Sequence, residues 1–141
     1  MKGVEVSGTS QTNYADAELL ELYRSGIEED FSTLEKILSD IEQNSDRTFE
    51  AMDQARCIVH NMKGQGTSFG FPLMTRLGDS FYMLLKHQVA QRELHQSTTK
   101  LYEAHLKAMR SVIENEISGD GPEIFQQVAA SLKEKVTQVV D

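Results

Sequence analysis

Apolar residues recur every three or four positions along most of this chain, which is the spacing of amphipathic helices. Strand-like alternation of apolar and polar residues is missing. The first apolar stripe consists of Leu20, Tyr23, Ile27, Phe31, Leu34, Leu38 and Ile41. Gly26 is a position where this helix could bend or divide. It is expected to end near Asn44, because Asn44, Ser45 and Asp46 offer turn and N-cap chemistry.

Four more helices are expected after the first. The second covers about 47–68, and Gly70 beyond it supplies a C-cap that tolerates left-handed backbone. The third runs from Pro72, a residue that suits the first helical turn, to about Gln91. The fourth covers about 93–117, and a break follows at 118–122. The last carries the stripe Phe125, Val128, Leu132, Val136 and Val139.

These elements predict an all-α fold. Each helix has one apolar stripe and one polar face, as an antiparallel four-helix bundle with short connections requires. Residues 16–118 are expected to form that bundle, and residues 119–141 an additional, accessory C-terminal helix. Residues 1–15 are mostly polar and are expected to form a flexible N-terminal tail.

Composition narrows the class of protein. A chain of 141 residues with 39% hydrophobic and 26% charged residues fits one soluble globular domain. The lone Cys57 excludes an internal disulfide and, without a signal-peptide pattern, favours the reducing cytoplasm. No apolar run approaches the ~20 residues of a membrane span. The net charge of −8 argues against a nucleic-acid partner.

The second predicted helix carries the residues with the most chemistry. On a helical wheel, its core side collects Ala51, Met52, Ala55, Ile58, Val59, Met62, Gly66 and Phe69. His60 falls on the outer side, together with Asp53, Cys57, Asn61 and Gly64. Lys63 lies at the boundary, and its long side chain can curl outward beside the imidazole.

Two glycines inside this helix need a physical reason, since each costs about 1 kcal/mol relative to alanine. Gly66 faces inward, where close approach of another helix is a sufficient explanation. Gly64 faces outward, one turn beyond His60. Its missing side chain would leave the imidazole open to a bulky partner.

This layout suits phosphoryl transfer. Imidazole is largely uncharged and nucleophilic near neutral pH, and histidine can form covalent intermediates. Phosphoryl transfer asks mainly for positioning and for stabilisation of charge. Lys63, three residues after His60 and therefore on a neighbouring part of the helix surface, can neutralise part of the charge of a phosphoryl group.

The segment from residue 60 to residue 70, HNMKGQGTSFG, resembles the signature of histidine-containing phosphotransfer (HPt) domains. That signature has a histidine, then Lys-Gly at the third and fourth following positions, and a helix-ending glycine at the tenth. His60, Lys63, Gly64 and Gly70 match it. The resemblance covers about residues 16–117 and leaves the terminal helix outside.

The resemblance implies an HPt-like bundle that acts as a phosphorelay intermediate without kinase activity of its own. His60 would be phosphorylated, at Nε2, Lys63 would stabilise the phosphate, and Gly64 would give a receiver domain access. The partners would be the receiver domains of a hybrid histidine kinase and of a response regulator, which bring the Mg²⁺ and the phospho-accepting aspartate. The chain itself would hold no metal and no cofactor. Either Tyr82 or Lys86 could assist from the next helix.

Two alternatives stay open. In the first, the chain is the phosphoacceptor part of a histidine kinase, but such helices have an acidic residue directly after the histidine and a proline soon after. Asn61 and the proline-free helix depart from that pattern, and no glycine-rich nucleotide segment is present. In the second, the chain is a helical adaptor that keeps an HPt-like shape without phosphorylation.

Other polar residues are expected to be structural or solvated. No pair among His87, His95 and His105 has the three- or four-residue helical spacing of metal ligands, and His105 is expected in a hydrogen-bonded position in or near the core. Cys57 is expected to be an exposed, inert thiol. The acidic run at 28–30 is expected to be a solvated face.

Overall fold

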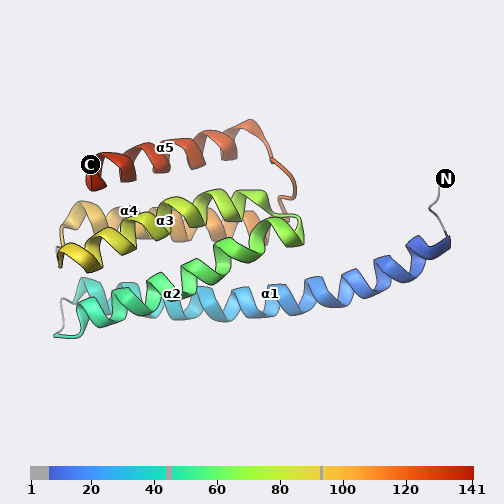
Figure 1. Ribbon diagram of the computed structural model, residues 1–141, viewed down its shortest axis with the longest axis horizontal. Coiled ribbons are helices and arrows are strands. Elements are labelled where there is room, and N and C mark those ends of the chain that lie inside the picture. Colours follow the sequence, from blue (N-terminus) through green and yellow to red (C-terminus); the bar gives the residue numbers. More distant parts are fainter. Residues whose placement is uncertain (1–6, 44–45, 93) are drawn as a thin grey trace.

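The fold is seen in a computed structural model that describes residues 7–43, 46–92 and 94–141, with side chains from residue 17 onward. Within these residues it contains no strand, which confirms the all-α prediction. A short 3₁₀-helix, Thr67–Phe69, extends the second of its five α-helices (Figure 1). These five are α1 (Ser7–Glu42), α2 (Thr48–Gly66), α3 (Pro72–Gln91), α4 (Gln96–Glu114) and α5 (Glu123–Val140).

Successive helices run in opposite directions (Figure 1). α1 packs against α2 and α4, α2 packs against α3, and α3 packs against α4. α5 lies along α3 and α4. The contact between α2 and α3 is the most extensive of all. None of the described helices is long and apolar enough to cross a membrane.

α1 differs in extent from the helix that the sequence predicts. It begins at Ser7, within the stretch assigned to the N-terminal tail, and its first turns project beyond the other helices (Figure 1). It also runs through Gly26 without a break, so Gly26 does not divide it. Among the side chains described, which begin at residue 17, the first buried one is Tyr23. Residues 1–6 of the predicted tail, Asn44 and Ser45 of the predicted turn, and Glu93 lie outside the described residues.

The core takes one apolar stripe from each helix. From α1 it takes Tyr23, Ile27, Phe31, Leu34, Leu38 and Ile41, all buried as the periodicity predicts, whereas Leu20 of the predicted stripe is only partly buried. The rings of Phe81 and Tyr102 meet edge to face, with centroids 4.9 Å apart. The Tyr102 hydroxyl donates to the Leu34 carbonyl at 2.8 Å and so satisfies its buried polar atom.

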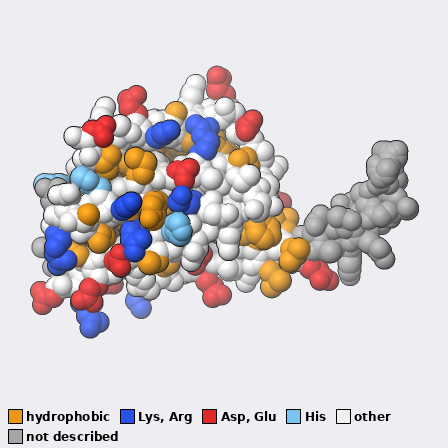
Figure 2. Space-filling view, viewed as in Figure 1, with side chains coloured by type: hydrophobic (Ala, Val, Ile, Leu, Met, Phe, Trp, Pro, Cys, Tyr) orange, Lys and Arg blue, Asp and Glu red, His pale blue; other side chains and the backbone are white. Residues whose placement is uncertain are grey.

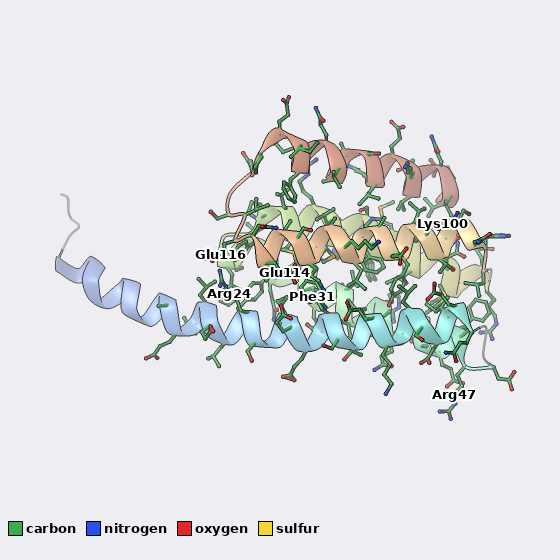
Figure 3. The ribbon with its side chains drawn as sticks, turned by 180° about the vertical axis from the view of Figure 1, so that it is seen from behind. Arg24, Phe31, Arg47, Lys100, Glu114 and Glu116 are labelled. Atoms are coloured by element: carbon green, nitrogen blue, oxygen red, sulfur yellow. The ribbon has the colours of Figure 1, made fainter. Side chains whose placement is uncertain are left out.

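An ion-pair seam joins α1 to α4 on the opposite side of the molecule from the view of Figure 1. Arg110 of α4 reaches Glu28 at 3.4 Å and Glu35 at 3.1 Å, and its guanidinium lies 4.9 Å from the centroid of the Phe31 ring. Figure 3 shows Phe31 on this side, where the α1–α4 seam faces the viewer. The acidic run at 28–30 is therefore not only a solvated face, because Glu28 takes part in an inter-helix contact.

The turn after α2 is tied to the connection before α5. Gly70 has a positive φ of 90°, and its N–H donates to the Thr67 carbonyl at 3.1 Å. This is the left-handed cap that the sequence predicts. The Gly70 carbonyl in turn accepts the N–H of Gly119 at 3.0 Å. One hydrogen bond thus links the end of the second helix to the start of the C-terminal segment.

His105 lies fully buried in α4, as the sequence predicts. Nδ1 is 2.7 Å from the Leu101 carbonyl, and Nε2 is 2.7 Å from the Ser80 hydroxyl. A carbonyl can only accept, so Nδ1 carries the proton and Nε2 accepts from Ser80. Burial lowers the pKa of His105 to about 4, while its hydrogen bond to Leu101 acts in the opposite direction.

The stability of the protein should therefore fall in mild acid. The pKa of His105 is lower in the folded chain than the value of about 6.5 in the unfolded chain, so protons favour unfolding. The contribution of neutral, buried His105 to the free energy of unfolding is complete above pH 6.5. It is lost as the pH falls towards 4, and the loss amounts to about 3 kcal/mol at most. Urea unfolding followed by circular dichroism at several pH values measures it. In His105→Gln this part of the pH dependence should disappear, and in His95→Gln it should persist.

Gly66, the last residue of α2, packs closely against the start of α3 and the residue before it. A Cβ on Gly66 would lie 2.8–2.9 Å from Thr75 Oγ1, Met74 Cβ and the Phe71 carbonyl oxygen. The inward glycine predicted from sequence therefore has the structural role expected of it. No side chain larger than hydrogen fits without movement of α3.

Gly66→Ala should lower the free energy of unfolding by about 1–3 kcal/mol, the usual cost of overpacking. The matched control is Gly26→Ala in α1, where a Cβ meets nothing within 4 Å. That variant should gain about 0.5–1 kcal/mol from helix propensity. Urea unfolding measures both. Equal effects of the two substitutions would contradict the close contact.

Candidate functional site

His60 stands on the exposed side of α2, as the sequence predicts. Gly64, one turn further on, is also exposed, and a Cβ built on it meets no atom within 4 Å. The core side of the same helix is closed by Met52, Ala55, Val59 and Met62, all buried. The helix thus presents an imidazole and a bare stretch of backbone side by side at its surface.

Tyr82 of α3 lies beside the candidate histidine. The ring centroids of His60 and Tyr82 are 5.3 Å apart, and the planes are tilted by 44°. Tyr82 is half-buried, and its ring limits how far the imidazole can move towards α3. Lys86, the other residue considered from sequence, is exposed and forms no hydrogen bond, ion pair or ring contact with the described residues. Of the two, Tyr82 contacts His60.

Lys63 lies at the junction of α2 and α3. Its ammonium is 3.1 Å from Oδ1 of Asp79 and 5.2 Å from the centroid of the Tyr82 ring. The side chain is partly exposed, which agrees with the boundary position predicted for it. Sequence analysis did not predict the carboxylate partner, because Asp79 is sixteen residues away and belongs to another helix.

The backbone at Lys63 is held tightly against α3. The Thr75 hydroxyl donates to the Lys63 carbonyl at 3.0 Å. A Cβ on Gly78 would lie 2.5 Å from Lys63 Cβ and 3.1 Å from its Cα, so α3 needs glycine at this point. Gly78 is therefore a positioning residue that sequence analysis missed. The feature of the sequence that could have indicated this role is a glycine on the buried face of the third predicted helix.

Arg56 is a second cation close to the candidate site that sequence analysis missed. It lies one turn before His60 on α2, and this spacing was the available signal. Its Nε is 2.8 Å from Oδ1 of Asp53, and one terminal nitrogen is 3.6 Å from Sγ of Cys57. Hydrogen bonds to Asp53 and to Tyr82 raise the pKa of Arg56 above its ordinary value. The guanidinium therefore belongs to the same polar surface as Tyr82.

The surface over α2 and α3 combines these groups. Figure 2 shows lysine, arginine and histidine side chains gathered among hydrophobic ones on this side of the molecule. Cys57 is exposed there, as predicted. Within the part of the chain that the structure describes, no three histidine, cysteine or acidic side chains come together as a metal site. The described residues place the His60 imidazole on one helix between two cationic side chains, Arg56 one turn before it and Lys63 three residues after it.

Comparison of the chain with protein-family models, with curated proteins and with solved structures finds no match. The assignment of a function therefore depends on the residues and on the geometry of this surface.

Proposed function

We propose that the protein is a phosphocarrier of a cytoplasmic phosphorelay, in which His60 accepts a phosphoryl group from one receiver domain and passes it to a response regulator. The observation that supports this most directly is the exposed imidazole next to the bare backbone at Gly64, with the Lys63 ammonium on the same surface. The resemblance of residues 60–70 to the HPt signature supports the same role. In this proposal α1 to α4 form an HPt-type four-helix bundle, and α5 is accessory to it.

The proposed transfer of the phosphoryl group needs neither an oxidant nor a nucleotide. The lone pair of His60 Nε2 attacks the phosphorus of an aspartyl phosphate on the donor receiver domain. A nitrogen–phosphorus bond forms as the bond between phosphorus and the carboxyl oxygen breaks, and the aspartate leaves with the electron pair. The phosphorylated ring then loses the Nδ1 proton to water. Transfer to the second receiver domain reverses these steps.

Each neighbouring group has a physical task in this proposal. Lys63 offsets part of the charge that the phosphoryl group brings. Gly64 lets the receiver domain approach the imidazole. The receiver domain supplies the Mg²⁺ and the aspartate, so the carrier needs neither a metal site nor kinase activity. Recognition by a small surface around His60 would be transient, as a relay requires.

The first test is transfer from a panel of phosphorylated receiver domains of the same cell. Wild-type protein should acquire an acid-labile, base-stable label, and His60→Gln should acquire none. The exposed substitution should change the free energy of unfolding by less than about 0.5 kcal/mol. His95→Gln, which replaces another exposed histidine, should keep the label. A label that persists on His60→Gln would defeat the site assignment, and signalling that persists without label would favour the adaptor.

The second test separates partner access from chemistry. Gly64→Gln places a long side chain beside the imidazole, so transfer from a phosphorylated receiver domain should slow on the order of tenfold, about 1.4 kcal/mol. Labelling by phosphoramidate, a donor small enough to pass that side chain, should stay within about twofold of wild type. Gly26→Gln, the same substitution at another exposed helical glycine, is the matched control. Equal loss with both donors would contradict a role in access.

A further inference from the structure

The ammonium of Lys63 is already bound in the unphosphorylated protein. Asp79 holds it at 3.1 Å, across the junction between α2 and α3. The carboxylate is more than half exposed, at 57%, and the lysine side chain less so, at 26%. An ion pair at this depth contributes little to stability, because water screens it. Because the pair adds little stability, its position next to Tyr82, the ring that also neighbours His60, favours a functional role.

Only the side chain of Lys63 is free to move. Its carbonyl accepts the Thr75 hydroxyl, and its Cα and Cβ lie against Gly78. The three carbons beyond Cβ can still rotate. The ammonium can therefore choose between partners while the helix that carries it stays in place.

A phosphoryl group on His60 would be such a partner. His60 and Lys63 are three residues apart on one helix and so are neighbours on its surface. Both also lie over one ring, since Tyr82 is 5.3 Å from the imidazole centroid and 5.2 Å from the ammonium. The ammonium thus contacts a carboxylate on α3, and the tyrosine ring that it lies over is also the neighbour of the imidazole.

We infer that Asp79 is a positioning residue that competes with the phosphoryl group on His60 for the ammonium of Lys63. The inference rests on the proposed function. Because the lysine must leave one anion to meet the other, Asp79 weakens the stabilisation of phosphohistidine. The phosphoryl group is then held loosely enough to be passed on, and the ammonium returns to Asp79 when the group departs.

The other charged groups at this surface supply an internal comparison. Arg56 is tied to Asp53 at 2.8 Å within α2 itself, and Asp53 makes no contact with Lys63. Asp53 and Asp79 are thus two carboxylates of the same surface that bind different cations. Only Asp79 should affect the phosphoryl group through Lys63.

The test uses full-length protein phosphorylated with phosphoramidate and follows the ionisation of the phosphoryl group by ³¹P NMR. Asp79→Asn should free the ammonium and so shift the titration midpoint of the phosphoryl group to lower pH. The expected change in the ionisation constant is about two- to fivefold, which corresponds to the free energy that a half-exposed ion pair contributes. Lys63→Gln should shift the midpoint to higher pH. In the Lys63→Gln background, Asp79→Asn should change the constant by well under twofold.

Asp53→Asn is the matched control, and its effect should be the same whether position 63 is Lys or Gln. An equal effect of Asp79→Asn in both backgrounds would overturn the inference, since the carboxylate would then act by its field alone. No effect in either background would overturn it as well. Failure of phosphoramidate to label His60 would instead contradict the proposed function, on which the inference depends.

Discussion

α2 and α3 meet through glycine on both sides of their contact, Gly66 on one helix and Gly78 on the other. At these two points a single methyl group would force the backbones apart. Everything at the candidate site depends on this separation, because the imidazole and the ammonium come from α2 while the tyrosine ring and the carboxylate come from α3. Contacts of 3–5 Å between side chains of two helices require the helix axes to be fixed to a fraction of that distance.

The same contact explains why the surface can be both rigid and adaptable. The backbone of Lys63 is held by a hydrogen bond from the Thr75 hydroxyl and by packing against Gly78. The charged ends of Arg56 and Lys63, in contrast, are held by ion pairs that water screens. Each of these two cations has a carboxylate partner in the structure, Asp53 for Arg56 and Asp79 for Lys63. A dianionic group arriving at the imidazole would meet cations that can rearrange without any movement of the helices.

Local sequence predicted those features that depend on one helix at a time. The outward position of His60, the inward position of Gly66 and the left-handed cap at Gly70 all follow from helical periodicity and backbone chemistry. Features that depend on two helices were not accessible in this way. Asp79 and Gly78 meet Lys63 only because α3 crosses α2 in one register, and no spacing within either helix specifies that register. The start of α1 was missed for a different reason, because its polar residues carry no apolar stripe to predict a helix.

The hydrogen bond from Gly119 to the Gly70 carbonyl connects two parts of the chain that are far apart in the sequence. It anchors the segment leading into α5 to the turn where α2 ends, ten residues beyond the candidate histidine. The start of the C-terminal segment and the end of the helix that carries the imidazole therefore share one backbone contact, so a displacement of either one strains or breaks the same hydrogen bond.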